Sequence, residues 1–286
     1  MSKRNSAEAK RAARERLRAE RERQHKRARL RRHVTVAGSV VATLAVAAGV
    51  GVAVAGRDDG GDSTDWGAVR AQIEDGENGE PASGDYPIEA PAGATGDDGL
   101  TIRIGQEDAT NTLTLYEDAR CPACAAFEQG VGAEVRQGLE NGDYAVEYVF
   151  GSFLDDGQAL GGSGSKNALN ALGAALDVST EAFLDFHDAL YSEEFHPEEA
   201  DDAYADDDRL IEIARTVPEL KDNADFERAV TGDTFAVWAL RMSDTFDADE
   251  DVTGTPTLKF NGEVVETPRT AEDFTAMVEE HSDEAE

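Results

Sequence analysis

A run of 23 residues without a charged side chain, Val34–Gly56, divides this chain into two parts of opposite charge. Residues 1–33 hold 14 Lys and Arg against 4 Asp and Glu, whereas the other 253 residues hold 13 against 56. As a helix, the run would reach about 34 Å at about 1.5 Å per residue, enough to cross a hydrocarbon core of about 30 Å. The sequence therefore predicts a transmembrane helix over 34–56, ahead of an acidic globular part.

The basic segment 1–33 sets the expected orientation of this helix. Positive charge next to a membrane span stays on the cytoplasmic side, so we expect a cytoplasmic N-terminus and an extracytoplasmic acidic part. The basic segment suits anionic lipid, and the acidic remainder excludes nucleic acid as a partner. A cleaved signal peptide is the alternative, because Ala53-Val54-Ala55 fits a cleavage site. The run exceeds the usual apolar core of about 7–15 residues, which favours an uncleaved signal anchor in the cell membrane.

Residues 57–99 are expected to form a flexible acidic linker. They are rich in Gly, Asp, Glu, Ser and Pro, and a segment with few apolar residues and many like charges cannot offset the entropy of ordering. Trp66–Ile73 is the one stretch with the pattern of a short helix that docks on a neighbouring surface.

The globular domain is expected to cover residues 100–286. Apolar and polar residues alternate over 100–105 and 111–118, as they do in strands. Apolar residues then recur at helical spacing from Cys121 until Asn141-Gly142, and 144–154 has the pattern of another strand. The motif Cys121-Pro122-Ala123-Cys124 therefore lies at the turn of a β-α-β unit, where the cysteines begin the helix.

This position has a chemical consequence for the two cysteines. The first N–H groups of a helix lack partners and its dipole is positive at that end, which favours a thiolate at Cys121. Cys124 is near enough to resolve a mixed disulfide, and Pro122 suits the first helical turn. Half a zinc site and a short structural disulfide are the alternatives. His187, His196 and His281 show no ligand-like spacing to one another, so no metal is expected. A disulfide that closes a loop of only four residues adds little stability, which argues against a purely structural disulfide.

A second motif, Thr255-Pro256-Thr257, lies far along the chain. It precedes two short strand patterns that flank Asn261-Gly262, a strong hairpin signal, and a closing helix from Ala271 to about Glu280. Proline is tolerated at a strand start, and the Pro256 peptide bond could be cis and face the cysteines.

Taken in order, these motifs resemble the DsbA-like thiol:disulfide oxidoreductases of the thioredoxin superfamily. The resemblance implies that Cys121 attacks, that Cys124 resolves, and that Thr255-Pro256 forms the cis-proline loop that aligns the substrate chain. It also implies exported polypeptides with cysteines as substrates and a membrane oxidase of the DsbB or VKOR type as redox partner. No cofactor is implied.

Three positions depart from the family's best-known pattern. Ala123 stands where the strongest oxidants of the family carry a histidine, so the redox potential stays open. Leu115 stands where some relatives have a buried acid, and Glu117 or Asp118 would then have to transfer the proton. Asp118 has an alternative interpretation as a turn or cap residue. Arg120 either adds positive potential beside Cys121 or is simply solvated.

About 100 residues between the third strand and Thr255 have helical patterns, which resembles the family's inserted helical subdomain, at about 163–250. The expected fold class is therefore α/β, a thioredoxin-like fold with a helical insertion, preceded by a single transmembrane helix. The expected function is disulfide formation in exported proteins through the Cys-Pro-Ala-Cys redox pair. A reductase of specific extracytoplasmic disulfides and a non-catalytic tethered binding module of thioredoxin fold are the alternatives.

Overall fold

The computed structural model describes residues 64–77, 80–157 and 161–282. The basic segment 1–33 and the predicted transmembrane helix 34–56 lie outside these residues. Within the described part of the chain, no helix combines the length and apolar character that a membrane span requires.

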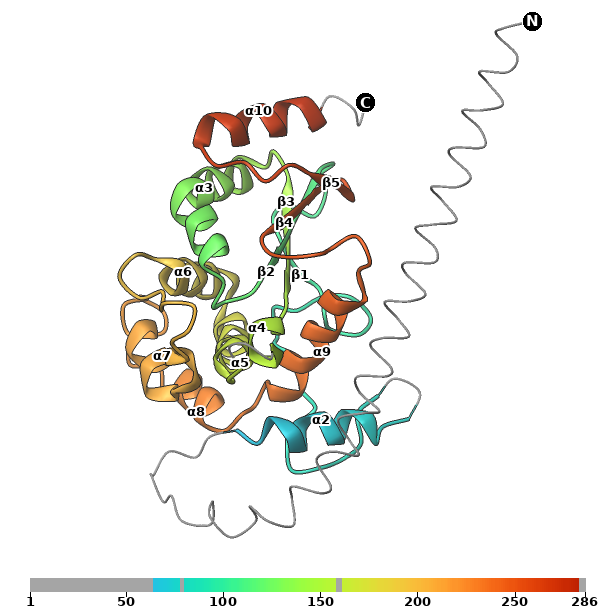
Figure 1. Ribbon diagram of the computed structural model, residues 1–286, viewed down its shortest axis with the longest axis vertical. Coiled ribbons are helices and arrows are strands. Elements are labelled where there is room, and N and C mark those ends of the chain that lie inside the picture. Colours follow the sequence, from blue (N-terminus) through green and yellow to red (C-terminus); the bar gives the residue numbers. More distant parts are fainter. Residues whose placement is uncertain (1–63, 78–79, 158–160, 283–286) are drawn as a thin grey trace, which may run out of the picture. The chain divides into compact units, whose positions relative to one another are not determined.

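Five strands form one mixed sheet, in the order β1-β3-β2-β4-β5 (Figure 1). Strands β2 and β3 are parallel, and the other three pairs are antiparallel. The strands are β1 (Ile102–Ile104), β2 (Thr112–Glu117), β3 (Ala145–Phe150), β4 (Thr257–Phe260) and β5 (Glu263–Val265). Strand β2 is central and five of its six residues are buried, so the polar residues of its alternating pattern are enclosed together with the apolar ones.

Helix α3 (Pro122–Asn141) joins the two parallel strands. It ends at Gly142, whose φ of 80° is the left-handed conformation in which glycine carries no steric penalty. The N–H of Asp143 returns to the carbonyl of Gly138 at 3.0 Å, which closes the helix end. The following strand is shorter than the predicted 144–154: β3 ends at Phe150, and a short helix, α4 (Phe153–Asp156), takes the last residues.

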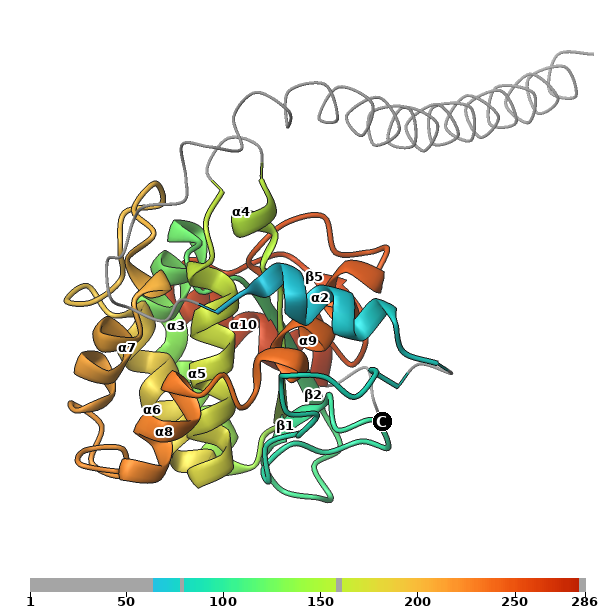
Figure 2. The ribbon, with the colours of Figure 1, turned by 90° about the horizontal axis from the view of Figure 1, so that it is seen from below.

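The helices inserted between β3 and β4 gather beside one end of the sheet (Figures 1 and 2). After α4 they are α5 (Gly164–Val178), α6 (Thr180–Tyr191), η1 (Ala203–Ala205), α7 (Asp207–Ala214), α8 (Ala224–Thr231) and α9 (Ala236–Ala248). Helix α5 is buried around most of its circumference and contacts α6, α8 and α9. Its buried Asn170 accepts from the N–H of Phe235 and donates to the carbonyl of Val230, which satisfies polar groups at the α8–α9 turn.

The prediction of a flexible linker over 57–99 is wrong for its described part. Helix α2 (Trp66–Glu74) begins at Asp65, whose carboxylate accepts from the N–H of Ala68, and it packs on α9. Val69 is fully buried against α9. The side chain of Gln72 pairs with both the N–H and the carbonyl of Tyr86. The docked helix is the one expected from the pattern of Trp66–Ile73, and one apolar helix face is enough to hold it.

The chain closes as the Asn261-Gly262 signal predicts. Asn261 and Gly262 have φ angles of 51° and 84°, the pair of positive values that a type I′ hairpin requires between β4 and β5. Helix α10 (Ala271–Ser282) follows and packs on α3, with Phe274 against Tyr144.

Candidate active site

Both cysteines lie where β2 turns into α3. Cys121 is the N-cap residue of α3, with extended backbone and with Pro122 as the first helical residue. The N–H of Cys121 donates to the carbonyl of Asp118 at 2.9 Å, which fixes the turn. Both cysteines are thiols; Cys121 is 6% exposed and Cys124 is fully enclosed. Both cysteines are therefore buried, and Cys121 is the one that keeps a small exposed fraction.

The two sulfurs differ strongly in acidity. The pKa of Cys121 is lowered from 9.0 to about 6, chiefly because the Cys124 thiol donates to it. Burial opposes this lowering, and the Thr255 side chain and the N–H groups of Cys124 and Ala123 support it. The pKa of Cys124 is raised well above 9.0, first by burial and then by its bond to Cys121 and the charge of Glu117. The site therefore favours a thiolate at Cys121 and a protonated thiol at Cys124.

The Thr255-Pro256 motif lies against the first of these sulfurs. Strand β4 pairs with β2, with Thr257 opposite Tyr116, and this pairing carries the preceding residues to the cysteine turn. The Thr255–Pro256 peptide bond is cis. Cys121 Sγ lies 3.6 Å from the carbonyl oxygen of Thr255. The structure therefore brings together Cys121, Cys124, Thr255 and Pro256, as the order of the motifs predicts.

Asp118 is a buried anchor of the turn. Its carboxylate accepts from the N–H of Arg120 at 3.0 Å, from the N–H of Leu154 at 3.2 Å and from Ser165 Oγ at 2.6 Å. Burial raises its pKa to about 7 against these bonds. The turn role expected for Asp118 is present, and it extends to α4 and α5.

Arg120 corrects the prediction of a solvated side chain. Its side chain is 1% exposed, and its guanidinium pairs with Asp155 at 2.8 Å and Asp202 at 3.0 Å. It also donates to the carbonyls of Gly161 and Glu199. Because two carboxylates balance its charge, Arg120 acts as a tie between the cysteine turn and the helical insertion. The principal causes of the low Cys121 pKa are hydrogen-bond donors and do not include Arg120.

Behind Cys124 lies a buried ionisable cluster that the sequence reasoning missed in part. The carboxylate of Glu117, at the end of β2, accepts from His187 Nε2 of α6 at 2.8 Å. One ligand atom from each of Glu117, Glu128 and His187 lies within 4.8 Å of the others. The spacing of the histidines along the chain did not indicate these acidic neighbours of His187, because they come from other elements. We call Glu117, Glu128 and His187 the buried triad.

The charge of Glu117 acts on the pKa of both other members. Burial is the largest single effect on His187 and lowers its pKa, but Glu117, Asp188 and Glu128 together outweigh burial and raise the pKa to about 10. The pKa of Glu128 is raised well above 4.5, first by burial and then by the charge of Glu117. A signal for Glu128 existed in the sequence: it follows Cys124 by four residues, so the two share a helix face.

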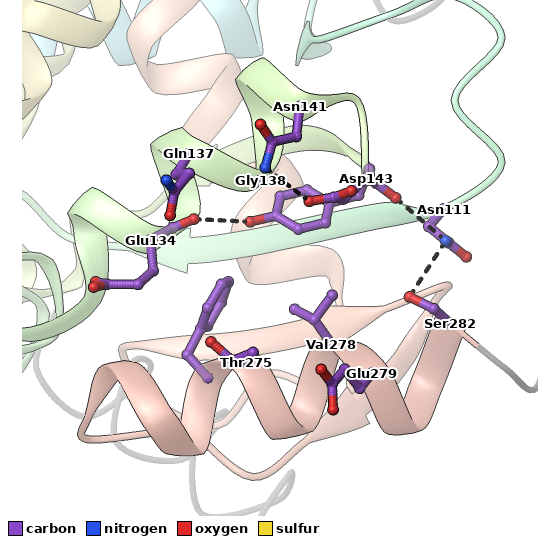
Figure 3. A pocket seen from close by; sticks show the side chains of 12 residues that line it. Asn111, Glu134, Gln137, Gly138, Asn141, Asp143, Thr275, Val278, Glu279 and Ser282 are labelled. Carbon is purple, nitrogen blue, oxygen red and sulfur yellow. Dashed lines mark hydrogen bonds between the residues drawn. The ribbon is translucent and has the colours of Figure 1, made fainter.

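A pocket of the described residues lies away from the cysteines. It has a volume of about 670 Å³ and opens between α3 and α10, beside Tyr144, Phe274 and Val278 (Figure 3). Amides and carboxylates such as Gln137, Asn141 and Glu279 surround it, and no member of the cysteine site lines it. The chemistry of the chain is therefore assigned to the cysteine turn.

A fold in which a cysteine pair begins the first helix of a mixed sheet, opposite a cis-proline loop, defines a thioredoxin-like protein. The family model described as Thioredoxin matches residues 97–280, and the chain belongs to this family.

Curated proteins that match in sequence include a kinase and a disulfide bond formation protein. The serine/threonine-protein kinase PknE of Mycobacterium tuberculosis is 26% identical over 121 residues, which cover 41% of this chain and 20% of the kinase. This chain thus matches about a fifth of the length of that relative. Disulfide bond formation protein D of Bacillus subtilis is 23% identical over 163 residues, 57% of this chain and 68% of that protein.

Among solved structures, the reduced form of the disulfide bond oxidoreductase DsbG of Mycobacterium tuberculosis is similar. It is 26% identical, with a TM-score of 0.54 over 65% of this chain and 91% of the DsbG chain. The similarity therefore spans nearly all of a disulfide oxidoreductase, and it leaves about a third of this chain outside.

Proposed function

We propose that this chain is a thiol:disulfide oxidoreductase that forms disulfides in exported proteins through Cys121 and Cys124. One observation carries the proposal: the pKa of Cys121, the less enclosed cysteine, is lowered to about 6, while Cys124 is fully enclosed and its pKa is raised well above 9.0. A structural clip would not need this asymmetry. The relatives named for disulfide chemistry support the same class of reaction.

The reaction begins from the Cys121–Cys124 disulfide. A substrate thiolate attacks Cys121 Sγ, the Sγ–Sγ bond breaks, and the electron pair leaves on Cys124, which takes up a proton. The second substrate thiolate then attacks the substrate sulfur of the mixed disulfide, and Cys121 leaves as a thiolate. The substrate has lost two electrons and the cysteine pair has gained them. Glu117 and Asp118 are our candidates for delivering the proton to Cys124.

The acidity of Cys121 favours this direction over reduction. A sulfur with a pKa of about 6 is a better leaving group than an ordinary thiol, so the second step runs toward a substrate disulfide. Stabilising the thiolate also stabilises the reduced pair, which makes the oxidised pair a stronger oxidant. Thr255 and Pro256 lie against Cys121, where the backbone of an extended substrate would pass.

The decisive experiment is the equilibrium potential of Cys121–Cys124 in the full chain, titrated with reduced and oxidised glutathione. We expect about −120 to −180 mV, the range of known oxidants and isomerases. A value of about −270 mV would instead identify a reductase. If the cysteine pair never equilibrates with glutathione, the non-catalytic binding module would be the remaining interpretation. Oxidative refolding of reduced ribonuclease gives the catalytic control: Cys121→Ser should lose it, and Gln137→Ala, on the exposed far face of α3, should keep it.

For the cellular setting we propose a single-pass anchor at Val34–Gly56 that holds this domain outside the membrane, where a DsbB- or VKOR-type oxidase reoxidises the pair. Treating intact cells with a membrane-impermeant maleimide tests the orientation. Reduced Cys121 should be labelled without lysis, and labelling that requires lysis would refute it. The mass of the mature chain distinguishes the anchor from a cleaved signal peptide.

A further inference from the structure

The buried triad lies in the space between β2, α3 and α6, one turn along α3 from Cys124. Glu117 is fully enclosed and His187 is 1% exposed, while Glu128 is half-buried. Glu117 uses one carboxylate oxygen for His187, and its other oxygen, Oε1, has no hydrogen-bond partner among the described residues. Glu128 Oε1 is also buried without a partner there. Glu117 and Glu128 thus each have a buried carboxylate oxygen that accepts no hydrogen bond from the described residues.

The charges of the triad do not balance by themselves. Two carboxylates share the space with one imidazole, which supplies one positive charge at most. A buried charge without compensation is costly, so the site requires a second positive equivalent. A proton can supply it, and so can a metal cation.

The donor set suits a divalent transition metal better than an alkaline-earth ion. Calcium takes six to eight oxygen ligands, which three residues cannot provide, whereas one imidazole nitrogen with two carboxylates suits Zn²⁺ or a similar ion. His187 Nδ1 lies 3.7 Å from a carboxylate oxygen of Asp188, beyond hydrogen-bond distance, and has no hydrogen-bond partner among the described residues.

One member of the triad borders a pocket. The pocket has a volume of about 380 Å³ and lies between α3 and α6, where Glu128, Asp188 and Tyr191 line it. The Tyr191 hydroxyl is buried and has no hydrogen-bond partner among the described residues. Glu128 is therefore the triad member at which a water molecule from the pocket would complete the coordination of an ion.

We propose that Glu117, Glu128 and His187 form a binding site for a divalent transition-metal ion, with Zn²⁺ as the ion we would test. The carboxylates and His187 Nε2 are the protein ligands. The cysteine thiols are not among the ligands, but a bound ion occupies Glu117, so in the metal-bound form Asp118 is the remaining candidate for delivering the proton to Cys124. The test of metal binding does not rest on the redox function.

Zinc binding is best measured on the oxidised full chain by equilibrium dialysis, because the Cys121–Cys124 disulfide removes the thiols as competing ligands. The dialysis buffer contains excess Mg²⁺ and moderate salt, which suppress non-specific binding of Zn²⁺ to the acidic surface. We expect one Zn²⁺ per chain. Glu128→Gln should weaken binding at least tenfold and abolish the rise in melting temperature that zinc produces, because it removes a ligand and preserves side-chain shape. Glu193→Gln is the matched control, since Glu193 lines the same pocket outside the triad.

His187→Gln provides a second test where circular dichroism shows a folded protein. Loss of binding in both triad variants, with full binding in Glu193→Gln, supports the site. Equal zinc binding by the unsubstituted chain and Glu128→Gln overturns the proposal and assigns the second positive equivalent to a proton. A redox potential outside the oxidant range would refute the proposed function and leave this result untouched.

Discussion

The thiol of Cys124 should control the acidity of Cys121, and replacing it tests how the site generates a thiolate. The pKa of Cys121 lies at about 6 instead of 9.0, and the first cause is the hydrogen bond that Cys124 donates. Cys124→Ala removes this donor and leaves the backbone N–H groups and Thr255. Cys124→Ser keeps a donor of similar size. The two variants therefore differ in the hydrogen bond while both abolish disulfide formation within the pair.

The size of the effect follows from the shift. Three pKa units correspond to about 4 kcal/mol of preference for the thiolate, shared among four donors and opposed by burial. Because the Cys124 thiol is the largest of these donors, its loss should raise the Cys121 pKa by about one unit or more. At pH 7 the thiolate fraction would fall from about nine-tenths to about one half or less.

Alkylation of Cys121 by iodoacetamide, followed from pH 4 to pH 10, gives the pKa as the midpoint of the rate. Cys124→Ala should have its midpoint near or above pH 7, and Cys124→Ser should stay closer to 6. A midpoint near 6 in both variants would refute the reasoning, since the helix N-terminus alone would then stabilise the thiolate. Equal upward shifts would show that a hydroxyl cannot replace the thiol as donor.

Three further predictions concern stability, each measured by urea unfolding. In the reduced protein the folded-state pKa of Cys121 lies below its unfolded value, so ionisation of Cys121 stabilises the fold at high pH, and this stabilisation is lost as the pH falls through about 6. The difference in free energy of unfolding between the reduced wild-type protein and Cys121→Ala should therefore grow by about 2 kcal/mol from pH 5 to pH 8. A difference that stays constant with pH would contradict the pKa shift. Arg120→Met should cost about 3 kcal/mol, because it leaves the enclosed carboxylate of Asp155 without its cation, whereas Arg228→Met at an exposed pair should cost about 0.5 kcal/mol or less. Val69→Ala should lower the free energy of unfolding by about 1–2 kcal/mol and speed proteolysis near residue 75. Unchanged stability and proteolysis would instead support the flexible linker that the composition of this segment predicts.

Features that depend on a few neighbouring residues could be predicted from the sequence. The start of α3 at the cysteines, its end at Gly142 and the Asn261-Gly262 hairpin each rest on local backbone preferences. The family resemblance then supplied the placement of Thr255-Pro256, which β-strand pairing brings to Cys121 across 134 residues. No local pattern contains that pairing.

The polar interior could not be predicted in the same way. Strand β2 is buried on both faces, so alternation did not show that Glu117 and Asp118 point into the protein. His187 lies 70 residues from its partner Glu117. One signal was available: His187 follows Phe183 by four residues, so the two side chains share an apolar helix face. A histidine on such a face needs a buried partner, but the sequence does not say which acid provides it.

Ala123 shows how the site makes an acidic cysteine without the histidine that the strongest oxidants of the family carry. Its methyl group is exposed, and its contribution to Cys121 is a backbone N–H. Donors that any residue in this position would supply, together with the Cys124 thiol and Thr255, bring the Cys121 pKa to about 6. An imidazolium at position 123 would place a positive charge near Cys121 and stabilise further a thiolate that is already favoured. Ala123→His should therefore lower the Cys121 pKa further and raise the reduction potential, because both changes stabilise the reduced pair.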